Sequence, residues 1–403
     1  MSVAKSKRLF AIIAMLVMLA MVVTACGGND GAENGGDNPG GDLVEVKIGV
    51  SSPFTGDVAA LGTGIRNGAQ LAIEEAAPEL EEMGISLSML AVDDAADPKT
   101  GVNAANQMVS DSAVVGIVAH LNSGVSIPAS AVYNEAGVVQ VSPASTNPAL
   151  TLQGFENVFR VCTIDTVQGS FAAEYAYDEL GFTSVAVIDD STPYGEGLAA
   201  EFAAAFEAKG GEITSTDKIQ VKDLDFTALV TKIRSANPDL IYFGGMYTEA
   251  ALVSKQSKEA GFEGPVMGGD GLYTQQYIDI AGAANAEGDF ATSIGLPLSE
   301  QPKGQEFQDM FEATFPGQTI EAYDTYAYDA TMVVVEAIKT VAADLGADAV
   351  TSVAGKQAII EAVAVTDMQG VTGNVSFDEN GDTTNKAVTP YVVRDGAWVP
   401  YTD

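Results

Sequence analysis

Short apolar runs alternate along the chain with longer segments whose apolar residues recur every three or four positions. The short runs fit buried strands and the longer segments fit amphipathic helices. We expect strands at Val44–Val50, Ile85–Val92, Val114–Val118, Val138–Val141, Val158–Cys162, Val185–Ile188, Leu240–Phe243 and Val266–Met267. We expect helices at Gly64–Ala77, Pro98–Asp111, Ser126–Ala136, Thr166–Leu180, Gly195–Lys209, Leu224–Ser235, Thr248–Ala260, Lys303–Phe315, Glu321–Leu345 and Ser352–Ala364.

This alternation predicts an α/β fold with two successive doubly wound parallel sheets, because apolar strands separated by helices form sheets that are covered on both faces. Near the end, Val388–Arg394 and Trp398–Tyr401 flank Asp395-Gly396, which indicates a hairpin. In doubly wound sheets, ligands bind beyond the carboxyl ends of the strands. The loops that follow strands are therefore where functional residues are expected.

The first 42 residues differ from this pattern. Lys5, Lys7 and Arg8 precede an apolar run, Leu9–Val23, that is too short for a spanning helix. Val23-Thr24-Ala25-Cys26 resembles the bacterial lipobox, whose cysteine takes lipid. We therefore expect 1–25 to be a lipoprotein signal peptide and 26–42 to hold the lipidated Cys26 and a flexible, Gly- and Asp-rich linker. An ordinary cleaved signal with a chance cysteine is the alternative.

Composition excludes several functions. The 403 residues include 55 acidic and 19 basic ones, for a net charge of -36, which argues against binding nucleic acid or docking by charge on anionic lipid. The single histidine, His120, argues against a His-rich metal site and a His-based triad, and we expect it in a packing or loop role. If Cys26 carries lipid, Cys162 has no partner; we expect a buried thiol rather than a reactive one.

No motif indicates an enzyme or a cofactor. The run Gly62-Thr-Gly-Ile-Arg-Asn-Gly68 has one residue too many for a dinucleotide-binding loop. The pairs Asp93-Asp94 and Asp189-Asp190 end strands, where they could do acid–base chemistry or bind calcium, but more often act as caps and loop acceptors. No nucleophile–base set accompanies them, so an exported hydrolase is a poor alternative, and we expect no metal or cofactor.

Seven segments taken together resemble the leucine/isoleucine/valine-binding family of type I solute-binding lipoproteins, the receptors of ABC amino-acid importers. Their order and spacing carry the resemblance, which covers about Leu43 to Asp403. The segments are Ile48–Gly56, Gly68–Ala76, Val92–Lys99, Ser142–Thr146, Asp190–Gly197, Phe226–Val230 and Phe243–Gly245.

The resemblance implies two lobes that close on a solute and are joined by crossovers near Thr163–Thr166, Thr292–Gly295 and Gly370–Asn374. The amino-terminal lobe would be 43–163 plus 294–371, and the carboxyl-terminal lobe 164–293 plus 372–403. It also implies capture of an amino acid, branched-chain or otherwise aliphatic, and delivery to an ABC permease by a monomer anchored through Cys26 on the outer face of the cytoplasmic membrane. A ligand-sensing receptor of the same fold, or a binder of another small solute such as an amide, are the alternatives.

The family's site carries over to five residues. Ser123 and Thr146, with backbone groups at Ala144, would hold the α-carboxylate; Asp270 would hold the α-ammonium, and Tyr194 would face the ligand. Helix starts favour anions, and a carboxylate suits an ammonium. From the residues alone, Ser123 and Thr146 could equally be helix caps, and Asp270 a turn residue.

This chain departs from the family at several positions. Ala96 and Asn122 stand where some relatives pair cysteines. We expect Leu61, Leu121 and Met246 to line the site, with Leu61 and Met246 near positions where an aromatic residue is common. Asp270 replaces a glutamate. These changes leave the contacts to a zwitterion in place but alter the pocket for its side chain.

Overall fold

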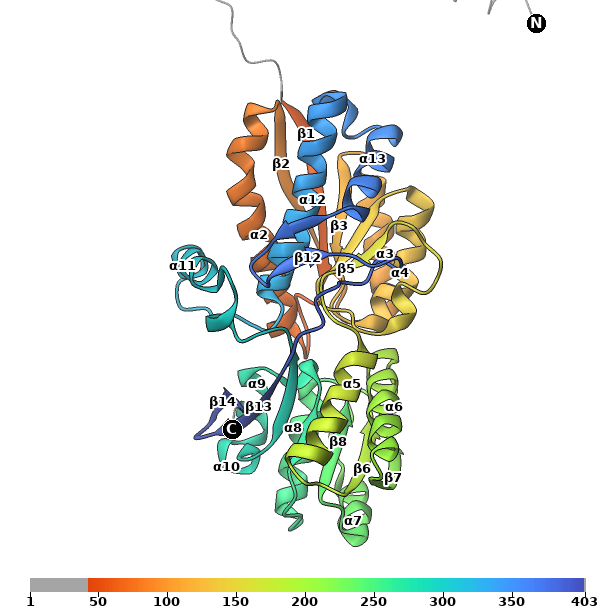
Figure 1. Ribbon diagram of the computed structural model, residues 1–403, viewed down its shortest axis with the longest axis vertical. Coiled ribbons are helices and arrows are strands. Elements are labelled where there is room, and N and C mark those ends of the chain that lie inside the picture. The colour runs from red at the N-terminus through yellow and green to blue at the C-terminus, as the bar shows by residue number, and fades with distance from the viewer. Residues whose placement is uncertain (1–42, 402–403) are drawn as a thin grey trace, which may run out of the picture. The chain divides into compact units, whose positions relative to one another are not determined.

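The computed structural model describes residues 43–401, so the expected signal peptide, Cys26 and the linker lie outside the described residues. Two sheets covered by helices organise the described chain (Figure 1). The first sheet has five strands, all parallel, in the order β2 (Ile85–Asp93), β1 (Val44–Ser52), β3 (Val114–Ala119), β4 (Val139–Ser142) and β5 (Val158–Arg160).

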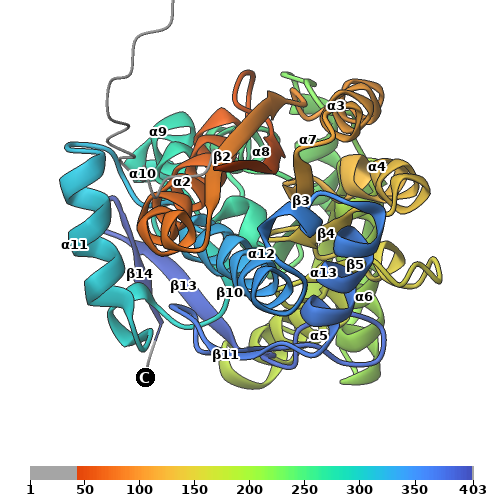
Figure 2. The same ribbon diagram turned by 90° about the horizontal axis from the view of Figure 1, so that it is seen from above.

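Helices cover both faces of the first sheet, as the apolar strands require. On one face lie α2 (Ala59–Glu82), α12 (Asp324–Leu345) and α13 (Val353–Ala364); on the other lie α3 (Pro98–Ser110) and α4 (Ser123–Ala136) (Figure 2). Local sequence sets their ends. Asp97 caps α3 by accepting a hydrogen bond from the Thr100 amide, and Gly137 ends α4 in the left-handed conformation.

The second sheet has seven strands, in the order β14 (Ala397–Pro400), β13 (Val388–Arg394), β10 (Phe290–Ile294), β9 (Val266–Gly268), β8 (Leu240–Gly244), β6 (Ser184–Asp189) and β7 (Glu212–Lys218). The last five strands in that order are parallel, whereas β13 and β14 add an antiparallel hairpin, so this sheet is mixed. The hairpin predicted around Asp395-Gly396 is confirmed.

Helices also cover both faces of the second sheet. On one face lie α5 (Asp165–Glu174), extended by a π turn at Tyr175–Glu179, and α6 (Pro193–Ala208); on the other lie α7 (Thr227–Ala236) and α8 (Tyr247–Glu259) (Figure 1). The short helices α9 (Gln275–Ala281) and α10 (Ala283–Ala286) pack beside α8. Thr192 caps α6, and Pro193 stands in its first turn.

Some elements differ from expectation. The sequence analysis missed β7, which lacks an apolar run because it is an edge strand, and β10, where it placed a crossover. Helix α2 begins five residues before the expected Gly64 and continues through Pro78. The remaining elements are α11 (Gly304–Thr314) and a hairpin of β11 (Asp367–Gln369) and β12 (Asn374–Ser376).

The chain passes between the two sheets after β5, after β10, and between β12 and β13. The third passage comes later than Gly370–Asn374, where the sequence analysis placed it. Backbone amides of Val371 and Thr372 still bond to Asp329 of α12, and Asp382 accepts a hydrogen bond from Nε of Arg160 at the end of β5, 2.6 Å away. These contacts keep the chain beside the first sheet until after Asp382.

Parallel strands of both sheets point their carboxyl ends toward one another. The loops at those ends touch: Nδ2 of Asn147 donates to the carbonyl oxygen of Pro193 at 2.6 Å, and the Tyr247 hydroxyl donates to the carbonyl oxygen of Asp57 at 2.7 Å. Residues expected to bind ligand therefore come together from two separate sheets.

Candidate functional site

The first half of the site lies on the loops after β3 and β4. Ser123 is the first residue of α4, and its Oγ accepts a hydrogen bond from the Asn147 amide at 3.3 Å, which ties the two loops together. Ala144 and Thr146 follow β4, and both are buried. The Thr146 hydroxyl has no hydrogen-bond partner. Buried hydroxyls beside a helix start can hold a carboxylate.

The second half lies on the loops after β6 and β9. The Tyr194 hydroxyl donates to Oδ1 of Asp270 at 2.8 Å and accepts from the Gly271 amide at 3.1 Å. Asp270 is fully buried, and this burial raises its pKa, although the Tyr194 and Tyr323 hydroxyls oppose the shift. The structure thus brings Tyr194 and Asp270 together.

Tyr323, which the sequence analysis did not select, joins the two halves. It precedes α12, a helix of the first sheet, yet its hydroxyl donates to Oδ2 of Asp270 at 2.8 Å. Both oxygens of Asp270 therefore accept a hydrogen bond from a tyrosine, one from each side. No motif marks Tyr323 in the sequence, since its role arises only when the two sheets meet.

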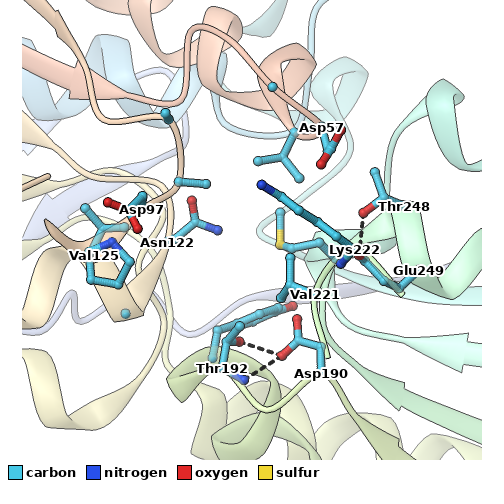
Figure 3. Close-up of a pocket in the computed structure, with 18 of the residues that line it drawn as sticks. Asp57, Asp97, Asn122, Val125, Asp190, Thr192, Val221, Lys222, Thr248 and Glu249 are labelled. Carbon is cyan, nitrogen blue, oxygen red and sulfur yellow. Dashed lines mark hydrogen bonds between the residues drawn. The ribbon is translucent and has the colours of Figure 1, made fainter. Parts of the chain in front are cut away.

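The three expected lining residues take different positions. Leu61 in α2 and Leu121 after β3 are buried in the core. Met246 precedes α8 and, with Tyr194, lines a pocket of ≈ 350 Å³ (Figure 3). The other expected site residues are buried and do not line this pocket.

Carboxyl groups surround this pocket from both sides (Figure 3). Asp57 and Asp97 come from loops of the first sheet, Asp190 comes from the loop after β6, and Glu249 comes from the first turn of α8. Asp190 is almost fully buried, which raises its pKa to about 6, while hydrogen bonds from Thr192 oppose the shift. The pocket therefore presents four carboxyl groups and one lysine, Lys222, between the two halves.

Asp165 is the first residue of α5. It is fully buried, and neither carboxyl oxygen has a hydrogen-bond partner. Burial raises its pKa to about 8, while the Thr146 hydroxyl opposes the shift.

The acidic pairs act as loop acceptors. Asp93 accepts from the backbone amides of Phe54 and Ala95, and Asp189 accepts from the Ser191 amide. In the described residues, no group of acidic, His or Cys side chains has the geometry of a metal site.

His120 and Cys162 are structural. Nδ1 of His120 lies 2.7 Å from Asp94 and its Nε2 lies 2.9 Å from the Tyr133 hydroxyl, with all three side chains buried. Cys162 is a free, buried cysteine, as predicted, and burial raises the pKa of its thiol. The described part of the chain contains no helix long and apolar enough to cross a membrane.

Comparisons with known proteins agree with this architecture. A profile of the family described as periplasmic binding protein matches residues 45–397. The Leu/Ile/Val-binding protein homolog 1 of Brucella suis is 34% identical over 343 residues, which are 85% of this chain and 89% of that protein.

Two solved structures extend the comparison. The leucine binding protein of Thermotoga maritima superposes with a TM-score of 0.80 at 31% identity, covering 89% of this chain and 98% of that one. The branched-chain amino acid transporter substrate binding protein of Streptococcus pneumoniae, solved in complex with isoleucine, gives a TM-score of 0.77 at 26% identity over 89% of this chain and 100% of that one. The chain therefore belongs to the periplasmic binding protein family, among the leucine/isoleucine/valine-binding proteins of type I.

Proposed function

We propose that this chain is the substrate-binding component of an ABC importer and that it captures a branched-chain or other aliphatic amino acid. It binds its substrate and does not transform it. The proposal depends mainly on one observation. The Ser123 and Thr146 hydroxyls lie by the start of α4 on one side, and the buried carboxylate of Asp270 lies on the other.

The two halves suit the two ends of a zwitterion. Ser123 and Thr146, beside the positive end of α4, would receive the α-carboxylate, with backbone groups of Ala144 completing that side. Asp270 would receive the α-ammonium as a charge-assisted hydrogen bond. The printed ligand of the Streptococcus relative, isoleucine, has this chemistry. Leu61, Leu121 and Met246 are the apolar candidates for its side chain.

The proposal includes a movement of two lobes. The first would be 43–163 plus the chain from 294 to the passage between β12 and β13, and the second 164–293 plus the chain from β13 onward, so the third boundary lies later than the sequence analysis placed it. A ligand that contacts both lobes binds the closed form better than the open one, so it shifts the population toward closure. The bonds from Asn147, Tyr247 and Tyr323 to the opposite lobe support a closed arrangement.

Membership of this family implies a location outside the cytoplasm. We further propose that the mature chain is a monomer tethered through lipid on Cys26 to the outer face of the cytoplasmic membrane, where it would meet its permease. The lipobox-like Val23–Cys26 supports this step. Two acyl chains are enough for stable anchoring, which would keep the protein near its partner.

A thermal-shift screen of residues 27–403 against the twenty amino acids tests the function. A ligand present at 1,000 times its dissociation constant stabilises the fold by about 4 kcal/mol, which raises the melting temperature by several degrees. We expect leucine, isoleucine or valine among the strongest stabilisers, and simple carboxylic acids and amines of the same size to have little effect. A protein that responds to no amino acid would refute the proposal.

A further inference from the structure

Arg160 is the largest side chain that the described part of the chain buries completely. It ends β5, directly before the first passage between the sheets. Arginine is almost never fully buried unless its charge is paired. Here the partner is Asp382, whose Oδ1 accepts a hydrogen bond from Nε at 2.6 Å.

One nitrogen of this guanidinium holds the loop that carries Thr146. Nη1 donates to the carbonyl oxygen of Ser145 at 2.7 Å and to that of Asn147 at 2.9 Å. These two carbonyl groups lie immediately before and after Thr146, a fully buried residue whose own hydroxyl has no hydrogen-bond partner. Arg160 therefore fixes the backbone on both sides of Thr146.

The two bonds also set the direction of the loop's amide groups. In a planar trans peptide, the C=O and the N–H point in opposite directions. Because the Ser145 carbonyl is turned toward Arg160, the Thr146 amide faces away from Arg160. The next amide, that of Asn147, donates to Oγ of Ser123 at 3.3 Å. Arg160 thus holds the loop from the side opposite to the Thr146 amide.

The same side chain is tied to the chain segment that leads into the second sheet. Nη2 of Arg160 donates to the Thr151 hydroxyl at 2.7 Å, and that hydroxyl lies 2.9 Å from Oδ1 of Asp382, to which it donates. The Arg160 amide donates to the carbonyl oxygen of Gly381 at 2.9 Å. Asp382 lies between β12 and β13, in the third passage. One buried cation therefore links this passage to the loop of Thr146.

We propose that Arg160 is a positioning residue for ligand binding: paired with Asp382, it holds residues 145–147 so that Thr146 can receive the ligand's α-carboxylate. This inference rests on the proposed function and deepens it. A buried ion pair adds little net stability, because the loss of hydration offsets the attraction. Binding groups, in contrast, must be held within about 0.5 Å of their productive geometry by side chains that are themselves fixed. The bonds of Arg160 meet that requirement for the loop.

Calorimetry with L-isoleucine, or with the strongest stabiliser from the screen, tests the inference on Arg160→Met and Arg160→Lys. Arg160→Met has no donors for the loop, and it should bind about 10- to 100-fold more weakly, the contribution of a hydrogen bond to a charged group. Arg160→Lys keeps the charge for Asp382 but lacks the fork that bonds several acceptors at once. It should recover only part of the affinity.

The amide of the ligand, L-isoleucinamide, separates positioning from general damage to the fold. It has the same side chain and ammonium but a neutral carboxamide in place of the carboxylate. Competition calorimetry gives the preference for the acid over the amide in each protein. Arg160→Met should reduce this preference by most of the loss measured for isoleucine. A fold that is merely loosened weakens both ligands alike and leaves the preference unchanged.

Asp329→Asn is the matched control. Asp329 is also fully buried and holds the chain before the third passage, since it accepts from the amides of Val371 and Thr372 at 2.7 and 2.9 Å. Its bonds go to that segment and not to residues 145–147, so its variant should lose stability but keep the affinity and the preference for the acid.

The outcomes separate the inference from the proposed function. If the wild type binds isoleucine and Arg160→Met binds it equally well, or no more weakly than Asp329→Asn, the inference is wrong while the proposed function stands. If Arg160→Met does not fold, the same comparison with Arg160→Lys decides. If the wild type binds no amino acid, the proposed function fails and the inference fails with it.

Discussion

Replacement of Asp270 by asparagine separates the charge of the site from its shape. The two side chains have nearly the same volume, so the buried position is not emptied. In the wild type, the hydroxyls of Tyr194 and Tyr323 each donate to one oxygen of the Asp270 carboxylate, at 2.8 Å. In the variant, one hydroxyl can still donate to the amide oxygen and the other can accept from the amide nitrogen. The fold should therefore survive the substitution.

The effect on binding should be large. Asp270 is fully buried, so its interaction with a ligand's ammonium takes place away from water. Removal of one partner from a buried charge pair costs about 2–5 kcal/mol, which corresponds to roughly 30- to 5,000-fold in the dissociation constant.

Isothermal titration calorimetry measures this loss, with Asp289→Asn as the control. Asp289 is another fully buried carboxylate of the same lobe, and it also accepts from a tyrosine, the Tyr277 hydroxyl at 2.7 Å. It lies away from the site, bonded to Ser254 and to the Val266 amide, so its variant should lose stability but keep the affinity. If Asp270→Asn and Asp289→Asn bind ligand equally well, Asp270 does not hold the ammonium.

Three further predictions concern the pH dependence of stability, the contact between the lobes and the lipid anchor. Burial raises the pKa of Asp165 to about 8 and of Asp190 to about 6, so the folded state keeps protons that the unfolded chain releases above about pH 4. The melting temperature of the ligand-free protein should therefore decrease as the pH is raised from about 5 to about 8. A melting temperature that does not change over this range would contradict these assignments. Tyr247→Phe removes the 2.7 Å hydrogen bond to the Asp57 carbonyl oxygen, which joins the two lobes. The variant should bind ligand about 2- to 10-fold more weakly, and its radius of gyration without ligand, measured by small-angle scattering, should increase. An unchanged affinity and radius of gyration would show that this bond does not favour closure. Cys26→Ser should move the exported protein from the detergent phase to the aqueous phase on Triton X-114 partitioning, whereas a wild type found in the aqueous phase would refute lipidation.

The regular part of the fold was predictable from the sequence because each buried strand reads as an apolar run. Strands β1, β3 and β8 appear close to their expected limits. The edge strand β7 was missed because half of its surface is not covered, and its sequence, Glu212–Lys218, carries no apolar run. β10 has two small polar residues, Thr292 and Ser293, in its middle, although all five of its residues are buried. Burial by packing on both faces is a tertiary property that such short sequences do not reveal.

The site was predictable only where a loop follows a strand and a motif fixes its alignment. Ser123, Tyr194 and Asp270 met both conditions, and the structure places Tyr194 and Asp270 in contact. Tyr323 met neither. It precedes a long helix, and its hydroxyl reaches Asp270 because the two lobes meet there. The roles of all these residues in binding remain predictions.

The most direct test of this account is a crystal structure of residues 27–403 with the amino acid selected by the thermal-shift screen. The account predicts the α-carboxylate within hydrogen-bond distance of Ser123 and Thr146, and the ammonium within about 3 Å of Asp270. A ligand that lies outside the space between the lobes, or one turned so that its carboxylate faces Asp270, would contradict it.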